Sequence, residues 1–444
     1  MPSVPPSYLS GLLGDPEVEA LLSGEAMLRA MLETEAVLAE AQAETGDIPA
    51  EAAEAIAAAA RRLTLDPEEL AAATQRDGVP VPALIGRLRD AVPQPHGHYA
   101  HWGATSQDIL DTATVLTLGN ALETCAGRLE GIIAALAGLA DCHRSTVMAA
   151  RTRGQQATLT SFGLKTAGWL LPLIRWRDRL PAVQQDLLVV SLGGASGTQA
   201  ALGKKARAVE TGMAQRLGLS LSTLPWHVQR DGPVQAGAWL AGLAGSLAKI
   251  AGDVAELCSS EIGELQLAGA GGSSTMPNKQ NPTRAEAIQA LAGQAFDLHA
   301  AVQRSALHRQ ERGGVAWFTE WLSLPPLAVA TAAALRHSLS LLDALEVDAA
   351  RMRANVEASN GLLLAEAASF ALAEQLPRGE AQELVKQACS ESLESGTHLL
   401  DSLAAKSSAA IDWQALRDPA RQLGNAEEMI DRALAAAKNT EEET

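Results

Sequence analysis

The feature of this sequence that most constrains its fold is a long apolar seam between residues 240 and 257. Its members alternate between spacings of three and four residues: Leu240, Leu243, Leu247, Ile250, Val254 and Leu257. This spacing is typical of helices that pack along their whole length. Alanine and glycine fill many of the positions between, so neighbouring helices can approach from several sides. The seam predicts a long helix inside a bundle, and it favours an oligomer with a shared helical core over a monomeric bundle.

The composition extends this prediction to the whole chain. The 444 residues are 47% hydrophobic, much of it alanine and leucine, and only 3% aromatic. Good helix formers are abundant, whereas the β-branched and aromatic runs that favour strands are scarce. A chain of this length normally forms two or three domains. We therefore predict an all-α fold with an N-terminal helical domain (1–111), a central long-helix bundle (112–355) and a C-terminal helical domain (356–444).

Charge and motif content exclude several kinds of partner. The net charge of −17 argues against binding nucleic acid or an anionic membrane surface. The first residues resemble no signal peptide, and the longest apolar runs are shorter than the ~18 residues that span a bilayer. The four cysteines are far apart and are expected to be reduced. The sequence contains no metal-binding or phosphate-loop motif, so we expect a soluble cytoplasmic protein with no cofactor and no metal.

A loop at residues 271–282 is the first candidate for chemistry. It opens with two glycines, which permit backbone conformations closed to other residues. Ser273 and Ser274 follow, and Lys279 and Asn281 stand two positions apart before a proline that suits the start of a helix. Hydroxyls, a fixed cation and an amide donor together indicate a loop that binds an anion.

The segment 101–108 is the second candidate. It contains His101, and its adjacent hydroxyl residues Thr105 and Ser106 precede a long helical pattern. The Thr-Ser-x-Asp order also suits a simple helix cap. A lone histidine is also more often structural than catalytic, so both interpretations stay open.

The segment 151–157 is the third candidate, because it places Arg151, Thr152 and Arg153 together. Arginine is permanently charged and its planar fork matches a carboxylate. An arginine pair can equally form a solvated face or an internal ion pair.

Together, in this order, the three segments resemble the fumarase/aspartase superfamily. Its signature loop, roughly G-S-S-x-M-P-x-K-x-N-P, is matched by residues 272–282, and its T-S-x-D element by residues 105–108. A GRTH-like element is matched in part by residues 150–153. The amino-acid sequences of the segments 101–113 and 311–325 are similar to those of the lactonising branch, the 3-carboxy-cis,cis-muconate cycloisomerases. Adenylosuccinate lyases are the next most similar branch.

The resemblance implies a three-domain helical subunit and a homotetramer with a central helical bundle. Each active site is then built from three subunits. It further implies lactonisation of a small anionic substrate, a 3-substituted cis,cis-muconate, in bacterial aromatic (protocatechuate-type) catabolism, the β-ketoadipate pathway.

The same resemblance implies roles for the candidate residues. Ser273 is the expected proton donor, with Ser274 beside it. Lys279 and Asn281 are expected to hold the carboxylate that becomes an enediolate. Five further residues are expected to bind or line the substrate: His101, Thr105, Ser106, Arg151 and Thr152.

Arg153 departs from the pattern of many superfamily lyases, which place a proton-donating histidine there, assisted by a glutamate that matches Glu286. An arginine with a pKa above ~12 cannot exchange protons near neutrality. An intramolecular carboxylate addition needs no such acid, so Arg153 favours a cycloisomerase in which it binds a substrate anion, with Glu286 as a supporting partner. Three alternatives to a 3-carboxymuconate cycloisomerase stay open. They are a cycloisomerase that acts on 3-sulfomuconate, an adenylosuccinate-type lyase and a non-catalytic member of the fold.

Overall fold

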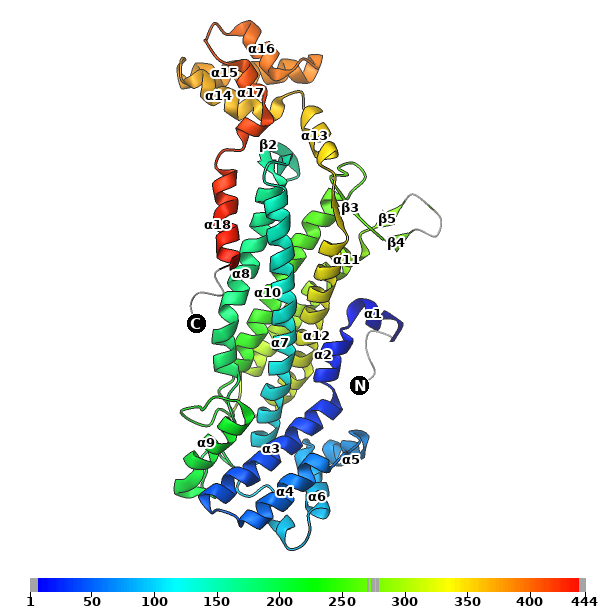
Figure 1. Ribbon diagram of the computed structural model, residues 1–444, viewed down its shortest axis with the longest axis vertical. Helices are drawn as coiled ribbons and strands as arrows, with labels where there is room; N and C mark the ends of the chain where they lie inside the picture. Colours follow the sequence, from blue (N-terminus) through cyan, green and yellow to red (C-terminus); the bar gives the residue numbers. More distant parts are fainter. Residues whose placement is uncertain (1–6, 270, 273–275, 277–278, 439–444) are drawn as a thin grey trace. The chain divides into compact units, whose positions relative to one another are not determined.

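The computed structural model describes residues 7–269, 271–272, 276 and 279–438, and these form mostly α-helices (Figure 1). The all-α prediction is therefore confirmed. The chain divides into two compact units, each assembled from three stretches. Unit 1 comprises Met1–Arg128, Trp176–Leu247 and Ala290–Arg336, and unit 2 comprises Leu129–Arg175, Ala248–Gln289 and His337–Thr444. The three-domain division expected along the chain stays a prediction.

Five long helices contribute residues to both units. They are α7 (Ser106–Cys142), α8 (Phe162–Leu187), α10 (Asp231–Leu257), α11 (Thr283–Ser305) and α12 (Gly314–Asp343). The shorter helices of unit 1 are α1 (Ser10–Leu13), α2 (Pro16–Leu21), α3 (Gly24–Thr45), α4 (Ala50–Arg62), α5 (Glu68–Asp77), α6 (Val81–Ala91) and α9 (Ala206–Leu217).

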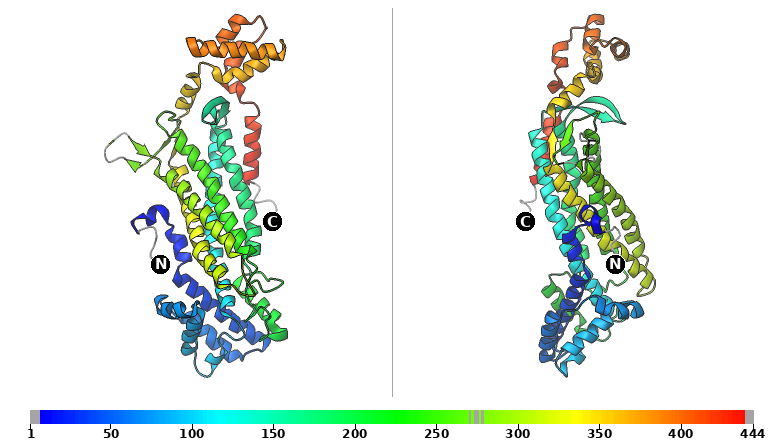
Figure 2. Two further views of the ribbon diagram at one scale, coloured as in Figure 1. Left: turned by 180° about the vertical axis from the view of Figure 1, so that it is seen from behind. Right: turned by 90° about the vertical axis from the view of Figure 1, so that its right-hand side faces the viewer.

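The core of unit 1 forms where α3 packs against α4 and α9 (Figures 1 and 2). Local sequence sets the limits of α3. The Ser23 hydroxyl accepts a hydrogen bond from the Ala26 amide at 3.2 Å, which caps the start of the helix. Gly46 ends it with φ +69°, a left-handed conformation that glycine adopts without steric cost. The helix buries an alanine- and leucine-rich face, which supplies most of its stability in the fold.

The predicted seam lies in α10, and all six of its apolar residues are buried. The glycines beside the seam leave room for large side chains of neighbouring helices. A Cβ at Gly242 would lie 2.3 Å from the ring of Trp176, and one at Gly245 would lie 2.7 Å from the ring of Phe296. Close approach by large side chains thus explains why glycine interrupts an otherwise strong helical sequence. The prediction of a long helix packed on several sides is confirmed.

In the part of unit 2 that the structure describes, further helices and three two-stranded ladders join its parts of the long helices. The helices are α13 (Ala349–Glu357), α14 (Ala365–Ala373), α15 (Arg378–Ser395), α16 (Leu399–Lys406), α17 (Trp413–Arg417) and α18 (Ala426–Lys438). The antiparallel ladders are β1 (Val147–Thr152) with β2 (Gln155–Ser161), β3 (Leu265–Leu267) with β6 (Leu345–Val347), and β4 (Gly271–Gly272) with β5 (Gln280–Asn281).

The core of unit 2 is centred on α14, α15 and α16, and Leu159 of the β1–β2 hairpin packs against the same cluster. A smaller cluster joins α18 to the unit 2 parts of α7 and α8 through Ile430, Ala433, Ala140 and Ala167. Of the helices in the described part of the chain, none combines the length and apolar character that crossing a membrane requires.

Candidate active site

The segment around Thr105 lies in unit 1, at the start of α7. The carboxylate of Asp108 accepts a hydrogen bond from the Thr105 amide at 2.9 Å, while the Asp108 amide donates to the Thr105 carbonyl at 3.0 Å. This reciprocal pairing is a helix cap, so the structural interpretation of the Thr-Ser-x-Asp order holds. Thr105 and Ser106 are half-buried at this helix start, and their contact with a substrate stays a prediction.

Asp108 also holds the glycine-rich turn that follows α8. Its carboxylate accepts hydrogen bonds from the amides of Gly193 at 2.6 Å and Gly194 at 3.0 Å, and it lies 2.7 Å from Nε2 of His227. A Cβ on residue 193 would lie 2.7 Å from the His227 ring, and Gly194 has φ +69°. Space at one glycine and backbone conformation at the other therefore explain the glycine pair.

A buried ionic cluster lies one turn further along α7. Arg230 donates to Asp111 at 2.8 Å and to Glu320 at 2.9 Å, and all three side chains are almost fully buried. The guanidinium also lies over the ring of Trp226, 4.7 Å from its centre. Burial, and then the charge of Glu320, raise the pKa of Asp111 above its usual value against the effect of Arg230.

A glutamine of α7 connects the hydrogen bonds around Asp108 with the buried ionic cluster around Arg230. Gln107 donates to the His227 carbonyl at 2.8 Å and accepts from Nε of Arg312 at 2.8 Å. Sequence reasoning missed this network. The available signal was the spacing of polar residues 107, 108 and 111 at the start of an apolar helix, because these positions share one helix face.

His101 precedes α7 and faces a buried carboxylate. Its Nδ1 lies 2.6 Å from Oε1 of Glu35 on α3, and the His101 side chain is 17% exposed while that of Glu35 is fully buried. His101 also adopts φ +65°, a left-handed conformation that is uncommon outside glycine. The sequence indicated His101, but not its partner.

Arg151 lies in β1 of unit 2, where its guanidinium is already paired. Its two terminal nitrogens donate to the buried carboxylate of Glu264 at 2.9 and 2.7 Å, and Asn355 donates to the same carboxylate at 2.8 Å. This forked ion pair joins the hairpin to the loop after α10. It corresponds to the internal ion pair that the sequence left open, and a substrate contact by Arg151 stays a prediction.

Arg153 lies at the tip of the β1–β2 hairpin. Thr152 pairs with Gln155, so Arg153 and Gly154 form a two-residue turn with φ values of +52° and +77°. Such turns need positive φ at both positions and favour Asn-Gly over Arg-Gly. Thr152 and Arg153 are exposed, as is Glu286. Among the described residues, Arg153 and Glu286 form no ion pair with each other.

The signature loop is described only in part, and Ser273 and Ser274 lie outside the described residues. Gly271 pairs with Asn281 and Gly272 with Gln280, so the two ends of the loop meet in a short ladder. Both glycines are strand residues and neither has a positive φ, so the predicted reason for them was wrong. At Gly271 the reason is space, since a Cβ would lie 2.9 Å from Oγ1 of Thr283.

The described end of the loop contains Lys279 and Asn281, the two residues predicted to bind a substrate carboxylate. Lys279 is exposed and its amide donates to the Met276 carbonyl at 3.1 Å, while Asn281 is half-buried in β5. Glu286 lies in the first turn of α11, where an acidic side chain is favoured by the helix dipole.

The predicted site residues thus fall into two groups. His101, Thr105 and Ser106 belong to unit 1, and the described residues from the hairpin and the signature loop belong to unit 2. Within the described ranges, no three His, Cys, Asp or Glu side chains are grouped so that they could hold a metal ion.

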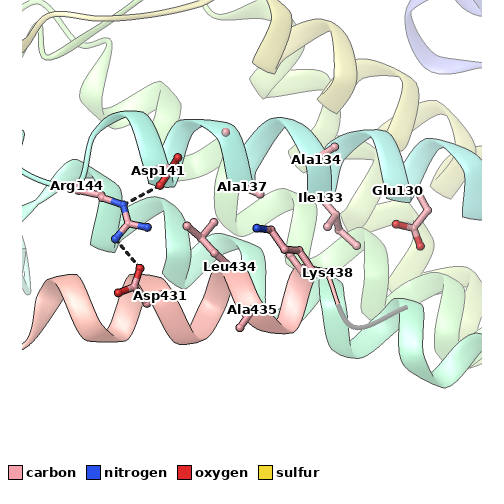
Figure 3. Close-up of a pocket in the computed structure, with 12 residues that line it drawn as sticks. Glu130, Ile133, Ala134, Ala137, Asp141, Arg144, Asp431, Leu434, Ala435 and Lys438 are labelled. Atoms are coloured by element: carbon pink, nitrogen blue, oxygen red, sulfur yellow. Dashed lines mark hydrogen bonds and ion pairs between the residues drawn. The ribbon is translucent and has the colours of Figure 1, made fainter. Parts of the chain in front are cut away.

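A cavity of about 620 Å³ lies elsewhere in unit 2, between α7 and α18 (Figure 3). Arg144 pairs with Asp141 at 2.7 Å and with Asp431 at 2.6 Å at one end of it. Alanine, glycine and leucine supply half of the twelve residues that line it, and none of the described site residues is among them. We therefore do not place the active site there.

Two sequence families match this chain. The one described as "Lyase" matches residues 17–297, and the one described as "Adenylosuccinate lyase C-terminus" matches residues 361–433. A 3-carboxy-cis,cis-muconate cycloisomerase of Bradyrhizobium diazoefficiens is 40% identical, covering 96% of this chain and 97% of that protein. A nitrosuccinate lyase of Streptomyces davaonensis is 39% identical, covering 96% of this chain and 94% of that protein.

A solved structure agrees with these matches. The crystal structure of 3-carboxy-cis,cis-muconate lactonizing enzyme from Pseudomonas putida superposes with a TM-score of 0.90 at 35% sequence identity, covering 97% of this chain and 98% of that one. The family predicted from the three segments is confirmed. The chain belongs to the fumarase/aspartase superfamily of lyases, together with cycloisomerases of its lactonising branch.

Proposed function

We propose that this protein is a cytoplasmic cycloisomerase that converts 3-carboxy-cis,cis-muconate into 4-carboxymuconolactone, in bacterial aromatic catabolism. The observation that carries the proposal is the arginine at the tip of the β1–β2 hairpin. Many superfamily lyases need an acid at this position to protonate the leaving group. Arg153 cannot supply a proton near neutrality, but it can bind an anion. Full-length similarity to cycloisomerases supports the same assignment.

The proposed reaction rearranges one substrate molecule and takes up one proton, which Ser273 supplies and regains from solvent. A carboxylate oxygen of the muconate adds to a carbon–carbon double bond and closes the lactone ring. The electron pair of that bond moves toward a second carboxylate and forms an enediolate. Ser273 then donates a proton to the α-carbon, with Ser274 beside it, and Lys279 and Asn281 stabilise the enediolate charge.

The hairpin conformation supports a binding role for Arg153. A non-glycine residue in the left-handed region costs on the order of 1 to 2 kcal/mol. Asparagine would suit the turn better, so the turn itself does not explain an arginine. An exposed guanidinium at the hairpin tip can bind a substrate anion, either the 3-carboxylate or the attacking carboxylate.

We further propose that the protein is a homotetramer with active sites completed by neighbouring copies. One face of α12 in unit 1 supports a partner. Val315, Phe318 and Leu322 recur at spacings of three and four, and they are 85%, 43% and 64% exposed. Three large apolar side chains along one helix face are unusual on a monomer surface unless another chain covers them.

Ultraviolet absorbance of the purified protein mixed with each candidate substrate tests the function. The substrates are cis,cis-muconate and its 3-carboxy and 3-sulfo derivatives, together with adenylosuccinate and nitrosuccinate. We expect the conjugated diene absorbance to fall fastest with 3-carboxymuconate, because lactonisation removes one double bond. Faster turnover of the 3-sulfo compound would reassign the substrate, and activity on a succinate adduct alone would make the protein a lyase.

A further inference from the structure

Glu35 and Gln42 are buried polar residues on one face of α3, a helix that also buries Thr34. Glu35 is 1% exposed and Gln42 is 0% exposed. Residues seven positions apart lie on the same face of a helix, two turns from each other. Both side chains reach the turn before α7. Glu35 meets Nδ1 of His101 at 2.6 Å, and Gln42 donates to the Trp102 carbonyl at 2.6 Å.

Burying a carboxylate here is costly, because a charged group loses its hydration. The cost is only partly offset. Oε2 of Glu35 and Oε1 of Gln42 have no hydrogen-bond partner among the described residues. A neutral glutamine at position 35 could accept the same hydrogen bond from His101 with a smaller desolvation cost. The negative charge at position 35 is therefore the feature that packing does not explain.

The backbone around His101 is held from two helices. His101 has φ +65°, and the carbonyls on either side of it accept hydrogen bonds from side chains. Arg89 of α6 donates to the Ala100 carbonyl at 3.0 Å, and Gln42 donates to that of Trp102. An uncommon conformation persists where its surroundings impose it, and such positions are often functional.

The charges around the ring favour its protonated form. Burial disfavours the imidazolium, and Arg89 also opposes it, but Glu35 and then Asp108 outweigh both and raise the pKa of His101 above its usual value. The second ring nitrogen, Nε2, bonds to no described residue and is not among the buried atoms that lack a partner. The protonated ring therefore presents a free Nε2–H donor to solvent.

We propose that Glu35 is a positioning residue that keeps His101 as an imidazolium, so that its Nε2–H binds a carboxylate of the substrate. This inference rests on the proposed function, whose muconate substrate carries three carboxylates. A chain of net charge −17 needs local cations to attract such a substrate. Glu35 supplies one indirectly, because it makes the positive charge of His101 persist to higher pH.

Histidine NMR tests the pair without any turnover. Ring-labelled histidine is titrated in the wild type and in Glu35→Gln, and His101→Asn identifies the resonance. We expect the pKa of His101 to fall by about 1 to 3 in Glu35→Gln, since the opposite charge is lost and the burial remains. Glu210→Gln is the matched control, because it removes another largely buried carboxylate of unit 1, on α9. It should leave the His101 titration nearly unchanged.

The binding role is tested with a saturated tricarboxylate, tricarballylate, at pH 8. The wild-type His101 resonance should shift saturably on addition, and that of Glu35→Gln should shift at least tenfold less at the same concentration. An unchanged wild-type resonance would overturn the proposal. This result is independent of turnover, so a chain that is inactive on every muconate refutes the proposed function and leaves this test intact.

Steady-state kinetics distinguish a role of Glu35 in substrate binding through His101 from a role in stabilising the fold alone. For an active enzyme, Glu35→Gln should raise KM for 3-carboxymuconate about tenfold at pH 8 with little change in kcat, and the alkaline limb of kcat/KM should move to lower pH. Glu210→Gln should keep the wild-type limb. Unchanged KM and an unchanged limb in folded Glu35→Gln would show that the pair only stabilises the fold.

Discussion

At the scale of single residues, Arg153 combines an unfavourable backbone conformation with an exposed charge. Replacement by asparagine should separate the two, because asparagine fits the first position of this turn. We expect Arg153→Asn to unfold at the same or a slightly higher temperature, with up to ~1 kcal/mol gained from the relaxed turn. Loss of a charge-assisted contact worth ~1.5 to 3 kcal/mol should lower kcat/KM by roughly 10- to 100-fold.

The matched control is Arg153→Lys, which keeps a positive charge and the strained turn. It should retain more activity than Arg153→Asn without the gain in stability. Thermal unfolding and steady-state kinetics of both variants check these expectations. Full activity of Arg153→Asn on every muconate would remove Arg153 from the site.

At the scale of elements, the start of α16 depends on a neutral histidine. Nδ1 of His398 accepts a hydrogen bond from the Leu400 amide at 3.2 Å, and only a glycine at position 361 leaves room for the ring. Burial, and then Arg417, lower the pKa of His398 against the opposing charge of Asp401. A protonated Nδ1 cannot accept, so acid removes this cap.

The sign of the pH effect follows from the lowered pKa. The unfolded chain takes up the proton first, so the stabilisation is complete above the unfolded value of ~6.5 and is lost as pH falls through the folded pKa. His398→Asn keeps a capping side chain that does not titrate. We expect its unfolding temperature to fall less between pH 7.5 and pH 5 than that of the wild type. Equal losses would show that another group dominates, and an NMR pKa of His398 above 6.5 would refute the cap argument.

At the scale of the whole molecule, the exposed apolar face of α12 needs a partner that covers it. Burying Leu322 against another chain should contribute ~1.5 to 3 kcal/mol, and a buried unpaired carboxylate is strongly unfavourable. We expect the wild type to be a tetramer in light scattering and Leu322→Glu to form smaller species. Leu393→Glu, at a similarly exposed leucine of α15, should stay tetrameric. A monomeric wild type would contradict both the tetramer and the shared sites.

Much of the fold follows from local patterns in the sequence. The seam of α10 and the caps of α3 are set by residues within a few positions of one another, so their physics is readable from spacing alone. The β1–β2 hairpin was missed, because Arg-Gly is a poor turn signal and the flanking residues alternate weakly. The loop glycines were predicted for the wrong reason, since their neighbours across the ladder come from the other end of the loop.

By itself the sequence determined the helical class, the long packed helices, the family and the candidate residues. Only the tertiary structure decided which of those residues already have partners. It paired Arg151 with Glu264 and left Arg153 exposed at a hairpin tip. It also brought Glu35 to His101, 66 positions later in the chain. Spacing along a helix cannot encode such meetings, because they depend on how separate elements pack and on which buried charges that packing leaves together.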